Sequence, residues 1–436
     1  MTHDDSYWDR LCELAGIDAS ADRGDLVPTE NASFRARTQV SALTLLRTSR
    51  KFSPFPYQSN LIEFLAQDRE LASVLVLPTG AGKTTVAMAA ALRWLEKQQS
   101  GSVIWIAPQR ELLNQAFGTA ERLWLGGSGP PALDLSMLPE DKTPTIATRP
   151  RITFATPQLI LARGLESIQA PQLLHVGAIV DEVHHFGAEA FNLIAQQLRA
   201  AGGRLLGMSA TPQPHHGDSR SALQRVFAGG LLLSEELGAA PIRALQTKQV
   251  LAQVSHVDIE VPPHVRAGVF GAASRWRLRD LVTDAERWNA VLETLESGTK
   301  DDRTLVSCID RRHGTALLAA LQARGKVTAA YIDGTTPMSA RMSVFEELVL
   351  GRVQVLLQVQ LVSEGVDLPC LNRLVLTYPL SSEIEAVQLI GRILRGPGLG
   401  GAAAASVHSS DIDEEWLNQS LYLADHNSST WATTRV

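Results

Sequence analysis

Short apolar runs alternate with stretches of helical periodicity through most of the chain. In the first half these runs are SVLVLP, SVIWIAP, RITFATP, VGAIVDE and RLLGMSATP, and each ends in proline or a polar residue. Apolar runs of this length, closed by such residues, are typical of strands buried on both faces of a parallel sheet. The repeated order of strand, loop and helix from Gln58 to Leu233 therefore predicts a doubly wound α/β lobe.

A second series of apolar runs begins near Thr304 and comprises TLVSCID, TAAYIDG, VQVLLQV, RLVLTYP and AAAASVHSS. It predicts a second lobe of the same kind. Residues 235–300 between the two series are less regular, and within them SRWRLRDLVTDAERWNAVLETLESG predicts one helix. Near the N-terminus, SYWDRLCELAG and FRARTQVSALTLLRTSR have apolar residues at helical spacing, which predicts two further helices.

The length of 436 residues also favours two lobes, because one hydrophobic core rarely supports a chain of this size. The predicted parts are a helical N-terminal extension (1–50), lobe 1 (51–235), a connecting segment with the first helix of lobe 2 (236–300), lobe 2 (301–410) and a C-terminal tail (411–436).

Composition and charge exclude several classes of protein. The chain has no apolar run near 18 residues and its first residues, MTHDDSYWDR, lack an apolar stretch, so we expect no membrane span, no secretory signal and a cytoplasmic location. Cys12, Cys308 and Cys370 are isolated, which argues against a disulfide framework or a structural zinc site. The net charge of −6 means that any nucleic-acid surface is a local patch.

The strongest chemical signal is VLVLPTGAGKTTVAM, a buried strand that runs into a glycine-rich turn and a helix. Gly80 and Gly82 let backbone N–H groups surround phosphate oxygens, and the helix N-terminus adds partial positive charge. Lys83 is expected to reach the β and γ phosphates, and Thr84 to place a hydroxyl on Mg²⁺. Leu77 stands where the strict G-x-x-x-x-G-K-[ST] pattern has its first glycine. The predicted nucleotide-binding residues of the loop are Thr79, Gly80, Ala81, Gly82, Lys83, Thr84 and Thr85.

The stretch VDEVHHFG follows an apolar strand and allows two interpretations. A transition metal held by Asp181, Glu182, His184 and His185 is disfavoured, because neighbouring strand residues point to opposite faces and the H-E-x-x-H spacing is missing. We favour a nucleotide site in which Asp181 holds Mg²⁺ through its waters and Glu182 deprotonates the water that attacks the γ-phosphate. The two histidines are either contacts to the next motif or ordinary structural histidines.

Together these motifs resemble superfamily-2 helicases and translocases, the DEAD/DEVH-box group with two RecA-like lobes. In lobe 1, PYQ is similar to the adenine-contacting motif, PTGAGKTT to the phosphate loop, DEVHH to the box and SATP to the coupling motif, while APQRELLNQ and ATPQ resemble strand-gripping motifs. In lobe 2, VSCID and YIDGTT resemble further nucleic-acid motifs, and SEGVDLP and QLIGRILR complete the set. The resemblance covers about residues 54–396. It implies two RecA-like doubly wound parallel-sheet lobes in tandem, with a small helical N-terminal extension.

The resemblance also assigns site residues, with ATP and Mg²⁺ as cofactors. The expected catalytic residues are Lys83, Asp181, Glu182, Gln388, Arg392 and Arg395, and the expected metal ligands are Thr84 and Asp181. Further nucleotide contacts are expected from Tyr57, Gln58, Gly365 and Asp367, and coupling of nucleotide state to lobe position from His184, Ser209 and Thr211. Phosphate-backbone contacts are expected from Arg110, Thr156, Gly334 and Thr335. Arg392 and Arg395 are three positions apart on an expected helix, so both guanidinium groups could serve the γ-phosphate.

The implied function is an ATP-dependent DNA helicase or double-strand DNA translocase that hydrolyses ATP at the interlobe cleft. PYQ, DEVHH, SEGVDLP and QLIGRILR look most like the DNA-directed branch that holds the XPB and RadD-like helicases and restriction-enzyme motor subunits. Leu389 replaces an arginine common in RNA-directed DEAD-box proteins, which disfavours an RNA helicase. The alternative is a motor subunit that remodels partners without unwinding. Expected partners are therefore DNA rather than RNA, and proteins of a repair or defence complex.

Overall fold

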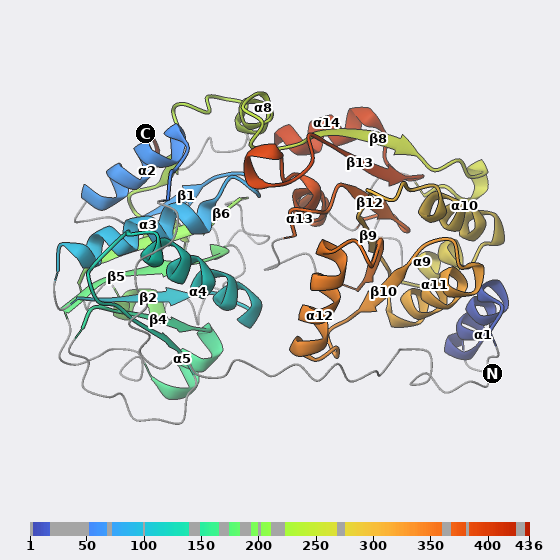
Figure 1. The fold of residues 1–436 in the computed structure, drawn as a ribbon, viewed down its shortest axis with the longest axis horizontal. Coiled ribbons are helices and arrows are strands. Elements are labelled where there is room, and N and C mark those ends of the chain that lie inside the picture. The colour runs from blue at the N-terminus through green and yellow to red at the C-terminus, as the bar shows by residue number, and fades with distance from the viewer. Residues whose placement is uncertain are drawn as a thin grey trace. The chain divides into compact units, whose positions relative to one another are not determined.

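The fold was analysed in a computed structural model, which describes residues 3–17, 52–67, 72–98, 101–138, 149–164, 174–183, 193–198, 202–210, 223–267, 275–359, 368–380, 383–423 and 432–436. The chain divides into two compact units, of residues 39–244 with 424–436 and of residues 1–38 with 245–423. We refer to them as lobe 1 and lobe 2. Figure 1 shows that each lobe is built around one sheet.

Lobe 1 contains an eight-stranded sheet with the order β14-β7-β1-β6-β5-β2-β4-β3. Its described strand pairs are all parallel. The strands are β1 (Ala72–Val76), β2 (Gly101–Ile106), β3 (Asp134–Met137), β4 (Arg151–Ala155), β5 (Leu174–Val180), β6 (Arg204–Ser209), β7 (Leu231–Leu233) and β14 (Thr433–Arg435). Because all the strands run the same way, their carboxyl ends meet along one edge of the sheet, which is where ligands of such folds bind.

The helices of lobe 1 are α2 (Pro56–Gln67), α3 (Lys83–Glu96), α4 (Arg110–Leu125), α5 (Pro157–Arg163) and α8 (Pro241–Thr247), the last of which spans the boundary with lobe 2. Alanines and aliphatic residues make up most of α3, and it is buried against α2 on one side and β2, β5 and β6 on another (Figure 1). The indole of Trp94 donates to the carbonyl of Leu65 at 2.8 Å and so fixes α3 to α2. The position of α3 matters because its first residue is Lys83.

Lobe 2 contains a six-stranded sheet with the order β10-β11-β9-β12-β13-β8, again with parallel pairs. The strands are β8 (Gln253–Asp258), β9 (Thr304–Ser307), β10 (Ala329–Ile332), β11 (Val355–Gln358), β12 (Arg373–Leu376) and β13 (Ala404–Ser409). The helices are α1 (His3–Ala15), α9 (Arg275–Val282), α10 (Ala285–Glu296), α11 (Arg311–Arg324), α12 (Met338–Val349), α13 (Glu383–Ile393) and α14 (Glu414–Leu423). Short 3₁₀ turns occur at Pro263–Val265 and Pro397–Leu399.

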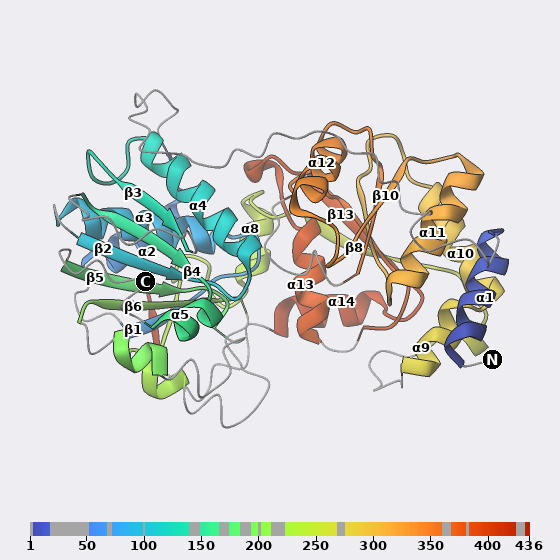
Figure 2. The same ribbon diagram turned by 90° about the horizontal axis from the view of Figure 1, so that it is seen from below.

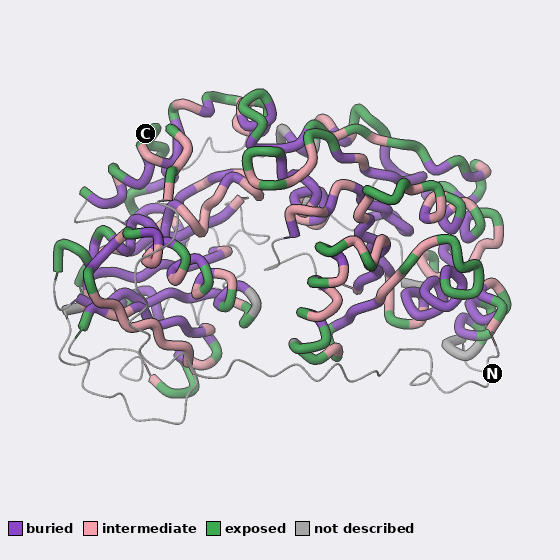
Figure 3. The backbone as a smooth tube through the Cα atoms, viewed as in Figure 1, coloured by how far each residue is buried: buried purple, intermediate pink, exposed green. Residues whose placement is uncertain are grey.

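The apolar runs identified in the sequence form strands β1, β2, β4, β5 and β6 in lobe 1 and β9 to β13 in lobe 2. These strands are buried along most of their length (Figure 3). The prediction of two α/β lobes with parallel sheets is thereby confirmed. In the part of the chain that the structure describes, no helix is both long and apolar enough to span a membrane.

One helix prediction was wrong in a specific way. The stretch expected to form a single helix forms two, α9 and α10, separated at Thr283 and Asp284. Asp284 caps α10, because its Oδ1 accepts from the backbone N–H groups of Glu286 and Arg287 at 3.0 and 3.1 Å. The carboxylate therefore starts a new helix where helical periodicity alone suggested continuation. The other N-terminal helix, expected over 34–50, lies outside the described residues.

The two ends of the described chain belong to opposite lobes. The predicted helix SYWDRLCELAG is α1, and it packs in lobe 2 beside α11 (Figures 1 and 2). The strand β14 instead joins lobe 1 as the edge of its sheet, beside β7. The segment expected to form a connection and the first helix of lobe 2 also supplies a strand, β8, to the sheet of lobe 2. Each lobe therefore contains segments that are distant in the sequence.

Candidate nucleotide and nucleic-acid sites

The glycine-rich loop lies between the end of β1 and the start of α3. Gly80 and Gly82 have φ angles of 88° and 85°, in the left-handed region that favours glycine. Gly82 is the N-cap residue of α3, and no side chain caps the helix. The first backbone N–H groups of α3 and its partial positive charge therefore provide an anion-binding end at this loop.

Two residues of α2 hold the loop in this shape. The Tyr57 hydroxyl and Gln58 Nε2 both donate to the carbonyl of Ala81, at 2.8 and 3.1 Å. Burial raises the pKa of Tyr57, so its hydroxyl stays protonated and remains a donor. Tyr57 and Gln58 are 0% and 4% exposed. Contact of these two side chains with adenine stays a prediction, whereas their bonds to the loop are observed.

The other residues of the phosphate loop differ in their contacts and their exposure. Lys83 Nζ donates to the carbonyl of Leu77 at 3.2 Å, so the lysine side chain folds back over the loop. Thr79, Gly80, Gly82, Lys83, Thr84 and Thr85 are partly exposed, and Ala81 is buried. The threonines and the lysine of the loop are therefore accessible at the surface. The buried Ala81 is held by the bonds from Tyr57 and Gln58.

Asp181 follows β5, which is separated from β1 by β6 alone. Its backbone N–H donates to the carbonyl of Ile106 at 2.8 Å, which extends the sheet by one residue, and the side chain is buried. Its Oδ1 accepts from the N–H of Glu182 at 3.0 Å. Ser209, the last residue of β6, is buried and pairs with Val76 of β1. The phosphate loop, Ser209 and Asp181 therefore follow three adjacent parallel strands.

Glu182 has a φ of 46°, one of two positive values among the described residues that are not glycine. This conformation is uncommon for a residue with a Cβ atom and is seen most often where surrounding structure enforces it. The chain consequently turns directly after Asp181, and the two carboxylates do not alternate as they would along a strand. His184, His185 and Thr211 lie outside the described residues.

The two strand-gripping motifs of lobe 1 follow β2 and β4, at the same edge of the sheet. Arg110 is the first residue of α4 and is exposed. Thr156 is the N-cap of α5, and its Oγ1 accepts from the N–H of Leu159 at 3.4 Å. Thr156 therefore has a local capping role, and its contact with nucleic acid stays a prediction.

In lobe 2, Gly334 and Thr335 form an exposed turn after β10. Asp333 organises this turn, because its Oδ1 accepts from the N–H and the hydroxyl of Thr335 at 2.7 and 2.6 Å. Arg341 Nη2 donates to the carbonyl of Gly334 at 3.1 Å. Burial opposes ionisation of Asp333, but hydrogen bonds from Thr335 and Tyr331 and the charge of Arg311 lower its pKa overall.

The sequence did not single out Asp333 or Arg341. In a D-G-T-T stretch after an apolar run, the aspartate side chain commonly accepts a hydrogen bond from the backbone N–H two residues later. This pattern could have identified Asp333. No local pattern identifies Arg341, because it lies on α12 and bonds the carbonyl of Gly334 seven residues earlier.

The arginine motif of lobe 2 differs from its prediction. Gln388 and Arg392 lie on α13 four positions apart and therefore share one face. The helix ends at Ile393, so Arg395 lies beyond it, and the prediction that both arginines lie on one helix was wrong. Arg395 is 8% exposed, its Nη1 donates to the carbonyl of Gly391 at 2.9 Å, and its backbone bridges to Leu251. Gly365 and Asp367 lie outside the described residues.

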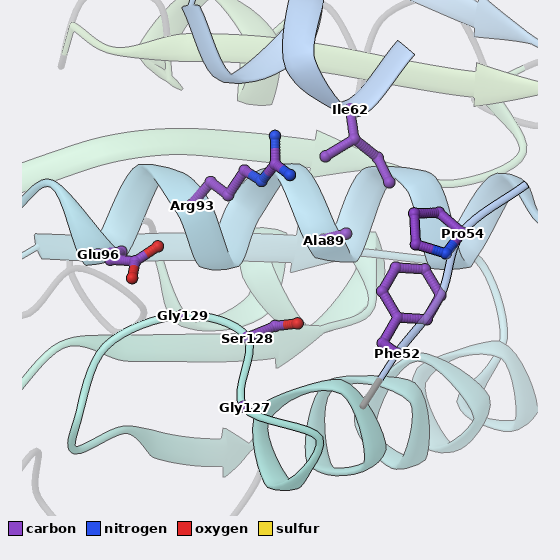
Figure 4. Close-up of a pocket in the computed structure, with 9 residues that line it drawn as sticks. All are labelled: Phe52, Pro54, Ile62, Ala89, Arg93, Glu96, Gly127, Ser128 and Gly129. Atoms are coloured by element: carbon purple, nitrogen blue, oxygen red, sulfur yellow. The ribbon is translucent and has the colours of Figure 1, made fainter. Parts of the chain in front are cut away.

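Lobe 1 also contains a hollow of about 250 Å³ (Figure 4). It is lined by Phe52, Pro54, Ile62, Ala89, Arg93, Glu96, Gly127, Ser128 and Gly129. Arg93 is ten residues beyond Lys83, which places it about 15 Å further along α3. This hollow is therefore not part of the candidate nucleotide site.

Comparison with known proteins agrees with this arrangement. Residues 51–214 match the family described as type III restriction enzyme, res subunit, and residues 286–397 match the helicase conserved C-terminal domain. The chain is 23% identical over 367 residues to putative helicase 22 of the Sulfolobus islandicus filamentous virus, covering 79% of the chain and 62% of that protein. It is 30% identical over 213 residues to the ATP-dependent DNA helicase mph1 of Aspergillus oryzae, covering 47% of the chain and 17% of that protein. The chain thus spans less than two thirds of either relative.

The fold is similar to that of S. cerevisiae Dbp5 bound to RNA and ADP BeF3, with a TM-score of 0.58 and 15% identity, covering 88% of this chain and 90% of that one. The family matches span both lobes, and they include the phosphate loop, Asp181 with Glu182, and the arginine motif. The chain belongs to the superfamily-2 helicases.

Proposed function

We propose that the chain is an ATP-dependent DNA helicase or double-strand DNA translocase. The observation that carries the proposal is the placement of three motifs on adjacent strands: the phosphate loop after β1, Ser209 at the end of β6 and Asp181 after β5. This placement puts an anion-binding helix end and a buried carboxylate at one edge of one sheet. Such an edge suits a nucleoside triphosphate with its divalent cation.

The residues present fit ATP and Mg²⁺. The N-terminal amides of α3 and Lys83 would hold the phosphates, and Thr84 and Asp181 would hold Mg²⁺, which prefers hydroxyl, carboxylate and water oxygens. The cation would neutralise phosphate charge when bound. Glu182 orients the attacking water and accepts its proton. The turn at Glu182 supports separate roles for the two carboxylates, since Glu182 does not continue the strand direction that ends at Asp181.

The roles of the lobe 2 motif are part of the proposal. Gln388 and Arg392 share a face of α13, and we assign this face to the γ-phosphate region. Arg395 is buried and bonded to the carbonyl of Gly391 in the preceding helix α13, which favours a supporting role for it over direct contact with the nucleotide. Ser209 and the undescribed His184 and Thr211 would couple nucleotide state to movement.

DNA is favoured over RNA as the nucleic acid. Aspergillus oryzae mph1 is named an ATP-dependent DNA helicase. The sequence also has Leu389 where RNA-directed members of the family commonly have arginine. We assign the chain to the DNA-directed branch that includes XPB and RadD-like helicases and restriction-enzyme motors.

A second candidate is supported by one specific observation. Residues 51–214 match a family described as the res subunit of type III restriction enzymes. A motor subunit of this kind would translocate or remodel partners in a defence or repair complex without separating strands. The two candidates share the ATP site and differ only in the outcome on DNA.

The test is ATP hydrolysis measured in parallel without nucleic acid and with single-stranded DNA, duplex DNA and RNA, with Lys83→Ala as the inactive control. We expect DNA to stimulate hydrolysis. Equal rates under all four conditions would overturn the motor function, and stimulation by RNA alone would replace DNA helicase with RNA helicase. Two further assays distinguish the candidates. Separation of the strands of a forked duplex would support the helicase, whereas displacement of a triplex-forming strand without strand separation would support the translocase.

A further inference from the structure

The N-terminal helix α1 contributes buried aromatic residues to lobe 2. Tyr7 and Trp8 are each 6% exposed and Leu11 is fully buried. The helix lies beside α11, whose first turn follows the VSCID motif at the end of β9 (Figures 1 and 2). A segment remote in sequence therefore packs next to a motif expected to serve nucleic acid.

Tyr7 makes a specific polar contact at this junction. Its hydroxyl donates to Oδ1 of Asp310 at 3.3 Å, and Arg279 of α9 lies 3.4 Å from the other carboxylate oxygen. The guanidinium carbon of Arg279 also lies 4.6 Å from the centre of the Tyr7 ring, within cation–π range. Burial, followed by the charge of Asp310, raises the pKa of Tyr7, so the hydroxyl stays a donor.

Asp310 is also the N-cap of α11. Its Oδ1 accepts from the backbone N–H of His313 at 3.0 Å. The carboxylate thus sets where α11 begins and how its first residues are directed. Arg279 and Asp310 keep only 15% and 13% of their side-chain surface exposed, so this pair is more restrained than a surface pair.

The next residue continues the connection to the candidate nucleic-acid turn. Arg311 Nε lies 3.1 Å from Oδ2 of Asp333. Asp333 in turn bonds the N–H and hydroxyl of Thr335, and Arg341 bonds the carbonyl of Gly334. A continuous series of contacts therefore runs from α1, through the start of α11, to the exposed Gly334–Thr335 turn.

We propose that Tyr7 is a positioning residue for the nucleic-acid-binding edge of lobe 2, acting through Asp310 on the start of α11 and on the Gly334–Thr335 turn. The inference rests on the proposed function, because it assigns this turn to the DNA backbone. It adds a segment outside both matched helicase domains, which cover residues 51–214 and 286–397. Packing alone does not explain the hydroxyl, since a phenylalanine would fill the same volume and keep the ring beside Arg279.

Tyr7→Phe removes only the bond to Asp310, so it tests the proposal with little risk to folding. The matched control is Arg10→Ala, which removes a different contact between α1 and the rest of lobe 2, the bond from Arg10 Nε to the carbonyl of Thr283 at 3.3 Å, without touching Asp310. Asp310→Asn keeps a side chain able to cap α11. The readouts are the DNA concentration that gives half-maximal ATPase stimulation and thermal unfolding of the full chain.

We expect Tyr7→Phe to raise the half-maximal DNA concentration about three- to tenfold, as the loss of one ordinary side-chain hydrogen bond predicts. Arg10→Ala should stay within about twofold of wild type, because an exposed contact contributes little. Tyr7→Phe should have a smaller effect in the Asp310→Asn background, because the amide oxygen of that variant accepts a weaker hydrogen bond from Tyr7 than a carboxylate oxygen does.

Four results would overturn the inference. Tyr7→Phe could lower the unfolding temperature with no change in DNA response, which would make its role structural. Tyr7→Phe and Arg10→Ala could shift the DNA response equally, which would show a general effect of helix docking. If wild type itself shows no response to nucleic acid, the proposed function fails and the inference fails with it, whereas a DNA-stimulated wild type with an unaffected Tyr7→Phe variant removes the inference alone.

Discussion

Arg287 of α10 and Asp411, which follows β13, form a buried ion pair in lobe 2. Arg287 Nη2 lies 2.5 Å from Asp411 Oδ2, and the two side chains are 2% and 1% exposed. The guanidinium also donates to the carbonyls of Thr377 and Val265. Asp411 accepts a further bond from the N–H of Ala267 at 3.1 Å. The pair thus joins α10 to the ends of β12 and β13 and to the segment before α9.

Asp411→Asn should destabilise lobe 2 strongly. The substitution leaves Arg287 buried without a counter-charge, and breaking a buried pair from one side costs about 3–5 kcal/mol. Urea unfolding of the full chain should show an earlier transition for lobe 2. The matched control is Glu347→Gln, which breaks the exposed pair with Arg352 and should leave the transition in place. Identical unfolding of the two variants would contradict this role of the pair.

The sequence predicted the sheets better than their edges. Central strands such as β2, buried at every position, are continuous apolar runs and were identified. The edge strand β8 was missed because most of its residues are partly or fully exposed, so no apolar run marks it. In lobe 1, the edge strand β14 and its neighbour β7 have three residues each, too few for any periodicity. Edge strands depend on a partner strand for their conformation, and partners are not visible in local sequence.

The candidate site was predictable where backbone chemistry fixes it. Gly80 and Gly82 were assigned from their spacing and have the positive φ angles that this role requires. Arg395, three positions after Arg392, was expected on the same helix, but α13 ends at Ile393 and the Arg395 backbone pairs with Leu251. The packing of Tyr7 against Asp310 joins residues 303 positions apart, which no local pattern can reveal.

Gly82→Ala should abolish tight nucleotide binding. A Cβ at this position would meet Gln58 Nε2 at 2.5 Å, and its φ of +85° is unfavourable for alanine. Relief of the clash would move Gln58 away from Ala81 and release the loop. We expect nucleotide affinity to fall about tenfold or more, equivalent to about 1.4 kcal/mol. The control is Gly118→Ala, where a Cβ meets nothing within 4 Å. Unchanged nucleotide affinity in Gly82→Ala would show that the loop does not depend on Gln58.

Gly230→Ala should detach β14 from lobe 1. A Cβ at Gly230 would lie 2.0 Å from the carbonyl oxygen of Ala432, the acceptor for the Leu231 N–H. Gly202→Ala is a close control, because Gly202 has the same φ of +78° but open space around it. Amide hydrogen exchange should accelerate at Leu231 and Glu235 in Gly230→Ala and stay slow in Gly202→Ala. Equal protection in both variants would mean that β14 accommodates the methyl group.

Glu182→Gln should separate ATP binding from ATP turnover. The amide keeps the size of the side chain but cannot accept a proton from water. General-base catalysis typically contributes about 10²–10⁴-fold, so we expect turnover to fall by that factor while nucleotide affinity stays near wild type. Equilibrium binding of a labelled nucleotide and steady-state hydrolysis measure the two quantities. Residual turnover near the wild-type rate would remove Glu182 from the role of base.

Lobe 2 should lose stability in mild acid because of His408. Burial, reinforced by the charge of Arg373, lowers the pKa of His408 to about 4, and Arg373 Nε donates to His408 Nε2 at 3.0 Å. The folded state therefore favours neutral His408, whereas the unfolded chain protonates it near pH 6.5. This contribution to stability is complete above pH 6.5, decreases as the pH falls, and is lost by about pH 4. At pH 5 the loss amounts to about 2 kcal/mol.

His408→Gln isolates this contribution from the other groups that titrate in the same range. Glutamine can accept the bond from Arg373 but cannot be protonated, so its variant should lose less stability than wild type between pH 7 and pH 5. The measurement is the urea midpoint of lobe 2 at both pH values for the two proteins. His313, whose pKa burial also lowers to about 4, is present in both proteins and contributes equally to their pH dependence. The difference between the two proteins in the change of urea midpoint with pH therefore measures the contribution of His408. Parallel slopes would mean that His408 is protonated in the folded protein, and the bond from Arg373 could then not exist at pH 5.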